Sequence, residues 1–275
     1  MPAPNRPAQA PTRAEQGVSE PTRVERLYLL PLGHLDTSYE QMLPGTHDAA
    51  RYRFPVTAAL LDLGDRGWML IDTGMDDDLS RAPSLVWGAT PLADDIRPDL
   101  PHSETLTARL DELGVSPQDI THIVNTHLHF DHAGNNHRFP HATVHVRSQQ
   151  IQDTADRPGS YPIRWNPNAP STHPIDTDQQ IVPGVHVIAT PGHVLGHQSV
   201  RIELTDSPDM LLCGDAIPGQ DFLDTGNFDS FRDPATAAIT AHHLLGQAQT
   251  RHAVAVYSHD QAQLDRLRTT PDFYA

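Results

Sequence analysis

The sequence contains no lysine, because all 19 basic residues among its 275 residues are arginine. Schiff-base catalysis, pyridoxal-phosphate binding and the phosphate-binding P-loop all need a lysine ammonium group, so these three chemistries are excluded. The single cysteine, Cys213, has no partner for an internal disulfide, and the fold therefore does not depend on an oxidising compartment. No apolar run reaches the roughly 18 residues that suggest a membrane-spanning helix.

Basic residues are also few relative to acidic ones. The 35 Asp and Glu residues outnumber the 19 arginines and give a formal net charge of −16. Nucleic-acid binding depends on clustered Lys and Arg, so we expect no nucleic-acid partner. Residues 1–22 are rich in Pro and Ala and lack the apolar stretch of a secretory signal. We predict a disordered tail over 1–22 and one domain over 23–275, in a cytoplasmic protein that does not bind membranes; a homodimer is compatible with this composition.

Short apolar runs separated by Gly and Pro predict strands. They lie at 27–32, 56–64, 67–74, 120–126, 142–147, 184–190, 199–204, 210–217 and 252–259. Helices are predicted at 103–114, 147–156, 233–250 and 260–268, and proline-containing loops at 75–102 and 157–178. Ser103 is the expected N-cap of the first helix, and Asp233 with Pro234 opens the third. Because strands form meanders in each half with helices following, the fold class is α/β, a four-layer αβ/βα sandwich.

Histidine is abundant, with 18 copies, and four metal-binding side chains crowd one short segment. His127, His129, Asp131 and His132 directly follow the strand predicted at 120–126. A spacing of two puts His127 and His129 on one side of an extended segment, and the other two side chains reach a position beside it. One metal ion cannot easily take all four ligands from so short a loop, whereas two adjacent ions can. The pattern therefore predicts a dinuclear metal site.

Other polar side chains stand where later strands end. His193 lies in a Pro-Gly turn after a strand and is a candidate ligand, whereas His197 favours a structural hydrogen-bonding role. Asp215 ends an apolar strand, and its carboxylate can bridge two metal ions as a histidine cannot. His259 follows the last strand and, taken alone, is equally a ligand or an ordinary residue. Cys213, two residues before Asp215, is expected to point away from the site.

Together these motifs resemble the metallo-β-lactamase superfamily and, within it, the N-acyl-homoserine lactone lactonases. The resemblance covers nearly the whole chain from about Leu27. Its motifs are IDTG at 71–74, HLHFDHAGN at 127–135, TPGHVLGH at 190–197, GDA at 214–216 and HD at 259–260.

The resemblance implies a complete set of metal ligands. One ion would be held by His127, His129 and His193, the second by Asp131, His132 and His259, and Asp215 would bridge the two. Asp72 would steady the ligand loop, although by spacing alone it is equally an ordinary residue at a hairpin end. Imidazole and carboxylate ligands without thiolate suit two divalent ions, with zinc first and iron, cobalt or manganese as alternatives.

The resemblance also implies the reaction. A metal-bridging hydroxide would open the lactone ring of N-acyl-homoserine lactones, a quorum-quenching activity, because coordination lowers the pKa of water from 15.7 to about 7. Asp131 would carry a proton to the leaving alkoxide. Leu35, Trp87 and Phe222 are candidates to line an acyl pocket. One departure from the lactonase pattern is Pro218, which stands where these enzymes commonly carry a tyrosine that touches the substrate carbonyl.

Two other activities share this ligand pattern. A hydroxyacylglutathione-type thioester hydrolase uses the same ligands, but such enzymes offer a basic patch near the C-terminus, where this chain has only Arg266 and Arg268. A mononuclear iron persulfide dioxygenase would use part of the set and bind one iron rather than two ions. A non-catalytic metal-binding scaffold is the alternative outside enzymology.

Overall fold

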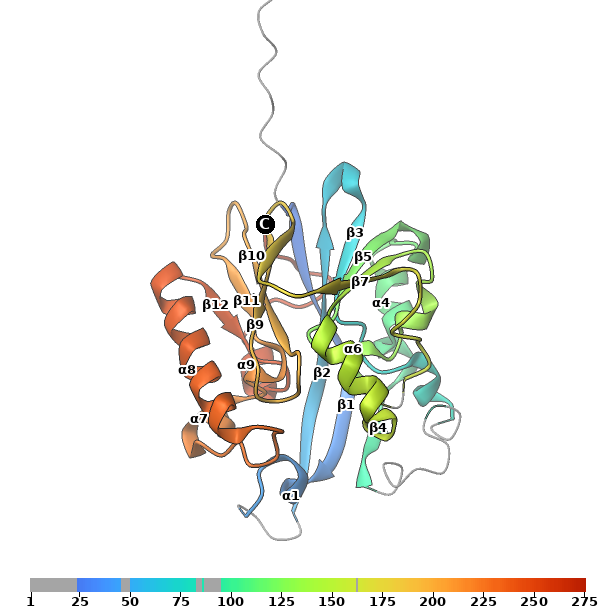
Figure 1. The fold of residues 1–275 in the computed structure, drawn as a ribbon. Coiled ribbons are helices and arrows are strands. Elements are labelled where there is room, and N and C mark those ends of the chain that lie inside the picture. Colours follow the sequence, from blue (N-terminus) through green and yellow to red (C-terminus); the bar gives the residue numbers. More distant parts are fainter. Residues whose placement is uncertain (1–23, 46–49, 83–85, 87–94, 162) are drawn as a thin grey trace, which may run out of the picture.

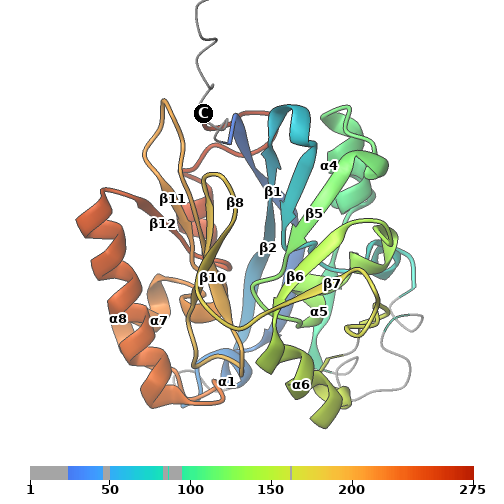
Figure 2. The same ribbon diagram turned by 45° about the horizontal axis from the view of Figure 1, so that its top comes forward.

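The computed structural model describes residues 24–45, 50–82, 86, 95–161 and 163–275. The tail predicted over 1–22 and the candidate pocket residue Trp87 lie outside the described residues. Two β-sheets face each other, and helices flank their outer sides (Figures 1 and 2). This arrangement confirms the four-layer αβ/βα sandwich.

The N-terminal sheet has seven strands in the order β4-β1-β2-β3-β5-β6-β7. Its strands are β1 (Arg26–Ser38), β2 (Arg51–Asp62), β3 (Trp68–Ile71), β4 (Arg97–Asp99), β5 (Ile120–Val124), β6 (Thr143–Arg147) and β7 (Thr172–Ile175). The pairs β4-β1, β1-β2 and β2-β3 are antiparallel, whereas β3, β5, β6 and β7 run parallel. The parallel strands therefore end at one edge of the sheet, where their following loops meet.

The C-terminal sheet has five strands in the order β12-β11-β10-β9-β8. They are β8 (Gln179–Val182), β9 (Val185–Ala189), β10 (Gln198–Ile202), β11 (Met210–Leu212) and β12 (Val254–Val256). Only β11 and β12 pair in parallel, so both of these strands end at the same edge.

The helices lie outside the two sheets. Within the described residues they are α1 (Tyr39–Met42), α4 (Leu106–Glu112), α5 (Phe130–Ala133), α6 (Ser148–Asp156), α7 (Gln220–Thr225), α8 (Pro234–Arg251) and α9 (Gln261–Leu264). Helix α8 flanks the five-stranded sheet, and α4 and α6 lie on the side of the seven-stranded sheet (Figure 2). Within the described part of the chain, no helix has the length and apolar character needed to cross a membrane.

The core is divided by the alternation of side chains along each strand. In β1, Leu27 and Leu29 belong to the buried cluster between the two sheets, whereas Tyr28 and Leu30 face the helix side. The same period of two is expected for any strand buried on both faces. The inter-sheet cluster fixes the two sheets against each other, which sets the distance between the loops at their shared edge.

Several predicted boundaries are wrong. Strand β1 runs on to Ser38 rather than ending at residue 32, because Gly33 takes a φ of +77° and the register shifts there without ending the strand. The loop predicted at 75–102 contains β4, and the loop at 157–178 contains β7, whose polar edge-strand sequence gives no apolar alternation. Strand 210–217 stops at Leu212 and continues as a 3₁₀ turn.

The predicted start of one helix is right, whereas other helix boundaries differ from the prediction. Helix α8 begins after Asp233, whose side chain accepts from Thr236 N, with Pro234 at its first position as predicted. The cap of α4 is Thr105 and not Ser103, since residues 102–104 form a separate 3₁₀ turn. The helices α7 and α9 show that short helices near turns carry a weak sequence signal, since α7 was not predicted and α9 is shorter than predicted.

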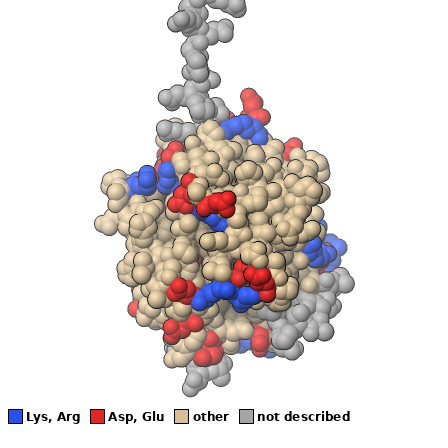
Figure 3. All heavy atoms as spheres, in the orientation of Figure 1, with Lys and Arg blue, Asp and Glu red and all other residues tan. Residues whose placement is uncertain are grey.

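Charged side chains of both signs lie next to one another on the face shown in Figure 3. Ion pairs of the described residues include Arg53 Nη1–Asp99 Oδ2 at 2.8 Å and Arg164 Nη2–Asp78 Oδ2 at 2.7 Å. These ion pairs balance some of the arginines locally, and the face in Figure 3 shows no continuous basic patch.

Gly134 closes the loop that follows β5, and we expect Gly134→Ala to destabilise the fold. A Cβ there would lie 2.3 Å from Asp76 N and 2.6 Å from Phe130 O, both backbone atoms that cannot rotate away. Overpacking of this kind costs about 1–3 kcal/mol, measurable as a lower midpoint in urea or thermal unfolding.

Gly246→Ala is the matched control, because no heavy atom lies within 4 Å of a Cβ at this position in α8. Alanine there should raise the stability by about 0.5–1 kcal/mol. Equal midpoints for the two variants would contradict the packing argument.

Candidate metal centre

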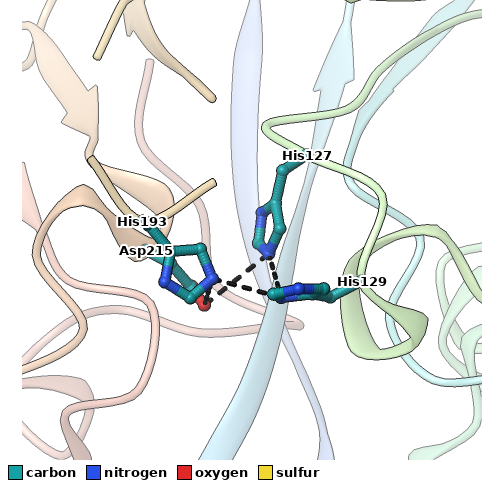
Figure 4. Close-up of side chains that lie close together, drawn as sticks. All are labelled: His127, His129, His193 and Asp215. Carbon is teal, nitrogen blue, oxygen red and sulfur yellow. Dashed lines mark hydrogen bonds and ion pairs between the residues drawn. The ribbon is translucent and has the colours of Figure 1, made fainter. Parts of the chain in front are cut away.

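The predicted ligands gather where strands of both sheets end. The loop after β5 carries His127 and His129, and it faces His193, which follows β9, and Asp215, which follows β11 (Figure 4). His259 follows β12 and Asp131 and His132 lie in α5, so all seven side chains come to one edge of the sandwich.

Four side chains form a first group, shown in Figure 4. His129 Nδ1 lies 2.9 Å from His127 Nε2 and 3.1 Å from His193 Nε2. Asp215 Oδ2 lies 3.2 Å from His193 Nε2 and 3.7 Å from His127 Nε2. All four ligand atoms are within 4.8 Å of one another, which is the size of a single coordination sphere.

Asp131, His132 and His259 form a second group. Asp131 Oδ2 lies 3.7 Å from the Nε2 atom of each of these histidines. Asp215 Oδ1 is 3.1 Å from His132 Nε2 and 3.2 Å from His259 Nε2. Asp215 thus turns one carboxylate oxygen toward each group, which is the geometry of a bridging ligand.

The donor atoms fit metal ions. A neutral imidazole has one N–H and one lone pair, so several ring nitrogens converging at about 3 Å cannot all pair with one another. Burial lowers the pKa of His127 and His193 well below the usual value, which keeps both rings neutral. Burial alone would raise the pKa of Asp215, yet the surrounding histidines hold it well below its ordinary range. Burial acts in the same direction on His132 and His259, but the nearby carboxylates outweigh it and raise the pKa of both, so a metal ion bound there would displace a proton from each ring. Imidazoles that have lost their proton and an ionised carboxylate are ligands that divalent cations bind.

Hydrogen bonds on the far side of the rings agree with this. Thr126 Oγ1 donates to Asp72 Oδ2 at 2.8 Å and therefore accepts from His127 Nδ1 at 3.1 Å. His132 Nδ1 donates to Asp72 Oδ2 at 2.8 Å. Both histidines consequently keep the lone pair of Nε2 for a metal, and Asp72 orients the ligand loop. Asp72 is 5 % exposed and holds a left-handed φ of +60°.

Two further contacts were not predicted. His259 Nδ1 donates to the backbone carbonyl of Pro55 in β2 at 2.9 Å, and Ser258 Oγ donates to Asp215 Oδ1 at 2.8 Å. A carbonyl acceptor more than 200 residues away leaves no signal in the sequence. Ser258 could have been suspected only from its place beside His259.

His197 lies behind Asp215 and is not in either ligand group. Asp215 N donates to His197 Nε2 at 3.0 Å, so the proton of this ring sits on Nδ1 and is donated to Thr190 Oγ1 at 2.8 Å. His197 thus links Asp215 N to Thr190 through its two ring nitrogens. Cys213 is fully buried, and burial raises the pKa of its thiol to about 12.

A cavity of about 330 Å³ opens over both ligand groups. Its apolar wall includes Leu35, Phe54, Ile96, Phe130, Pro218 and Phe231. Of the three candidate pocket residues, Leu35 lines this cavity. Phe222 does not: it is 0 % exposed and packs 5.7 Å from the ring of Phe231, in the layer behind the wall.

The chain is similar to several proteins with known functions. The N-acyl homoserine lactonase of Bacillus thuringiensis is 29% identical over 251 residues, covering 91% of this chain and 99% of that protein. The N-acyl homoserine lactonase AttM of Azorhizobium caulinodans is 27% identical over 268 residues, covering 90% and 98%.

A solved structure of an N-acyl homoserine lactone hydrolase, with the product N-hexanoyl-L-homoserine at its catalytic metal center, superposes with a TM-score of 0.81. It is 26% identical and covers 92% of this chain and 100% of that one. The sequence model of the metallo-beta-lactamase superfamily matches residues 51–259, which is more than half of the chain. The chain therefore belongs to the metallo-beta-lactamase superfamily, as its motifs indicated.

Proposed function

We propose that this protein is a metal-dependent hydrolase that opens the lactone ring of N-acyl homoserine lactones. The observation that carries the proposal is the position of Asp215, whose two oxygens each face one group of histidines. The similar lactonases have nearly the same length and are covered almost completely by the alignment, which supports the same reaction for this chain.

The proposed cofactor is a pair of divalent ions, zinc first and iron, cobalt or manganese as alternatives. His127, His129 and His193 would hold one ion, Asp131, His132 and His259 the other, and Asp215 both. When bound, such ions polarise an ester carbonyl and lower the pKa of water, which makes water a nucleophile near neutral pH.

The chain's own residues complete the chemistry. Cys213 is buried and protonated, so we propose water rather than a protein side chain as the nucleophile. Asp131 lines the cavity beside His259, where its carboxylate can accept the proton that the attacking water releases and pass it to the alkoxide that leaves when the ring opens. Asp72 and Pro55 hold the ligand rings in place during this transfer.

The cavity suits an acyl chain, since apolar side chains form much of its wall. Pro218 lines it at the position where the resemblance expects a tyrosine, and proline offers no donor to the substrate carbonyl. We therefore propose that recognition relies on the fit of the acyl chain more than on hydrogen bonds to the ring.

Composition supports the remaining parts of the proposal. The formal charge of −16 and the absence of lysine disfavour a nucleic-acid partner, and we propose a cytoplasmic protein without a membrane partner. The thioester alternative is disfavoured by the C-terminal arginines. Arg268 donates to the Phe273 carbonyl at 3.3 Å and lies over the ring of Tyr274, and neither Arg266 nor Arg268 lines the cavity.

A panel of N-acyl homoserine lactones and glutathione thioesters tests the substrate class. We expect kcat/KM for an acylated lactone to exceed that for any thioester by at least about tenfold, because the described lining of the cavity offers apolar contact and no arginine for the glutathione carboxylates. Thioester turnover without lactone turnover would replace the proposed function with the alternative one.

Metal analysis of the same sample should give about two divalent ions per chain. Treatment with a strong chelator should remove both metal and activity, and added zinc or cobalt should restore activity. Full activity of the metal-free protein would contradict the mechanism, and one iron per chain would favour the dioxygenase.

Substitutions of the proposed ligands and of Asp72 test their roles in turnover and in metal binding. Asp215→Ala and His129→Ala should each lower kcat by two or more orders of magnitude, and Asp72→Asn should lower metal affinity about 10–100-fold. His243→Ala, an exposed histidine on α8, is the matched control and should leave both quantities unchanged. Wild-type rates in Asp215→Ala would disprove its bridging role.

A further inference from the structure

Two of the five candidate ligand histidines are held differently from the others. His127, His132 and His259 each make a hydrogen bond through Nδ1, the nitrogen that faces away from Asp215. Among the described residues, His193 Nδ1 is buried without a hydrogen-bond partner, and the only ring contacts of His129 in hydrogen-bonding range run through Nδ1 to other ligands. No hydrogen bond to a described residue outside the ligand groups therefore orients these two rings.

Aromatic side chains pack against His129 and His193 instead. Tyr161 stacks on His129 with a distance of 5.3 Å between ring centroids and an angle of 25°. Phe231 meets His193 edge-on, at 4.7 Å and 79°. Both geometries are among those that aromatic pairs favour, and each is worth about 0.5–1.5 kcal/mol beyond burial. The orientation of His129 and His193 therefore depends on where Tyr161 and Phe231 are fixed.

One buried carboxylate fixes both supports. Asp153, on α6, is 2 % exposed, and its Oδ2 accepts the hydroxyl proton of Tyr161. Its Oδ1 lies 2.9 Å from Arg232 Nη1. Arg232 directly follows Phe231, and its backbone N–H donates to the carbonyl of His193 at 3.1 Å. Asp153 thus connects the ring behind His129 with the segment behind His193.

The chemistry of these partners makes the connection firm. Burial and the hydrogen bond to Asp153 raise the pKa of Tyr161 to about 12, so the phenol remains a donor. A buried carboxylate that loses either partner would be left with unsatisfied lone pairs, which is costly in an apolar environment. Movement of Tyr161 away from His129 is therefore resisted by the Asp153 contact.

We propose that Asp153 is a positioning residue for the metal site, which orients His129 and His193 through Tyr161 and Arg232 and so sets the affinity of their metal ion. The inference rests on the metal site of the proposed function. It does not depend on which ester the enzyme hydrolyses, because Asp153 contacts neither the cavity nor the second ligand group.

The test compares Asp153→Asn with Asp156→Asn, which removes the same charge from an exposed position on the same helix. Cobalt(II) affinities are measured by competition with a chromogenic chelator, and the absorption spectrum of the cobalt-loaded protein is recorded. Asp153→Asn should lower the affinity for one of the two cobalt ions about 10–100-fold and leave the affinity for the other unchanged. It should also shift the visible absorption bands of the cobalt-loaded protein. Asp156→Asn should match the wild type in both measurements.

Unfolding midpoints of the metal-free variants separate positioning from stability. An Asp153→Asn protein that is less stable but keeps both wild-type affinities and the wild-type spectrum would overturn the proposal. If Asp153→Asn does not fold, Tyr161→Phe is the second variant, because it keeps the stacked ring and removes only the hydroxyl. Tyr161→Phe should lower the affinity for the same cobalt ion a few-fold. Unchanged affinities in this variant would also overturn the proposal. Wild-type protein that binds two cobalt ions but hydrolyses no lactone would contradict the proposed function and leave the role of Asp153 standing.

Discussion

A negative charge is buried at Asp215, and the arrangement of the site follows from the need to compensate it. The carboxylate is 5 % exposed, and removing such a charge from water costs several kcal/mol unless partners replace the lost hydration. Four imidazole nitrogens lie within 3.7 Å of its oxygens, and Ser258 donates to one of them. The neutral rings of His127 and His193 would then leave their Nε2 lone pairs without a cation to bind. Divalent cations between them satisfy the carboxylate and the nitrogens at once.

The fold brings these groups together from distant parts of the sequence. The parallel strand β5 and the parallel pair of β11 and β12 end at the same edge, and the core between the sheets holds those ends at a fixed separation. Each sheet supplies part of each ligand group, so neither sheet alone could bind two ions. Metal binding should consequently stabilise the packing of one sheet on the other, since the ligands are preorganised only when both sheets are in place.

What the sequence could predict was local, and what it missed was long-range. The run from His127 to His132 is recognisable because its ligands are neighbours in the chain, and strand ends are marked by their apolar runs. The Pro55 carbonyl behind His259 and the contact of Asp153 with Arg232 join residues 204 and 79 positions apart, and no local pattern encodes them. Leu35 and Phe222 look alike in sequence, yet only the packing of whole layers decides that one lines the cavity and the other lies behind its wall.

The ligand rings are held in two ways, by hydrogen bonds to polar groups or by contacts with aromatic rings. His127 and His132 are hydrogen-bonded to fixed polar partners and lie away from the cavity, and His259 is hydrogen-bonded but lines it. His129 and His193 rest on aromatic rings and also line the cavity. Hydrogen bonds to a buried acceptor fix both direction and distance, whereas ring contacts constrain a side chain more loosely. Phe231 belongs to the cavity wall and also packs on His193. The surface that would receive an acyl chain is therefore the same surface that orients a metal ligand, so the shape of the bound chain and the geometry of that ligand cannot vary independently.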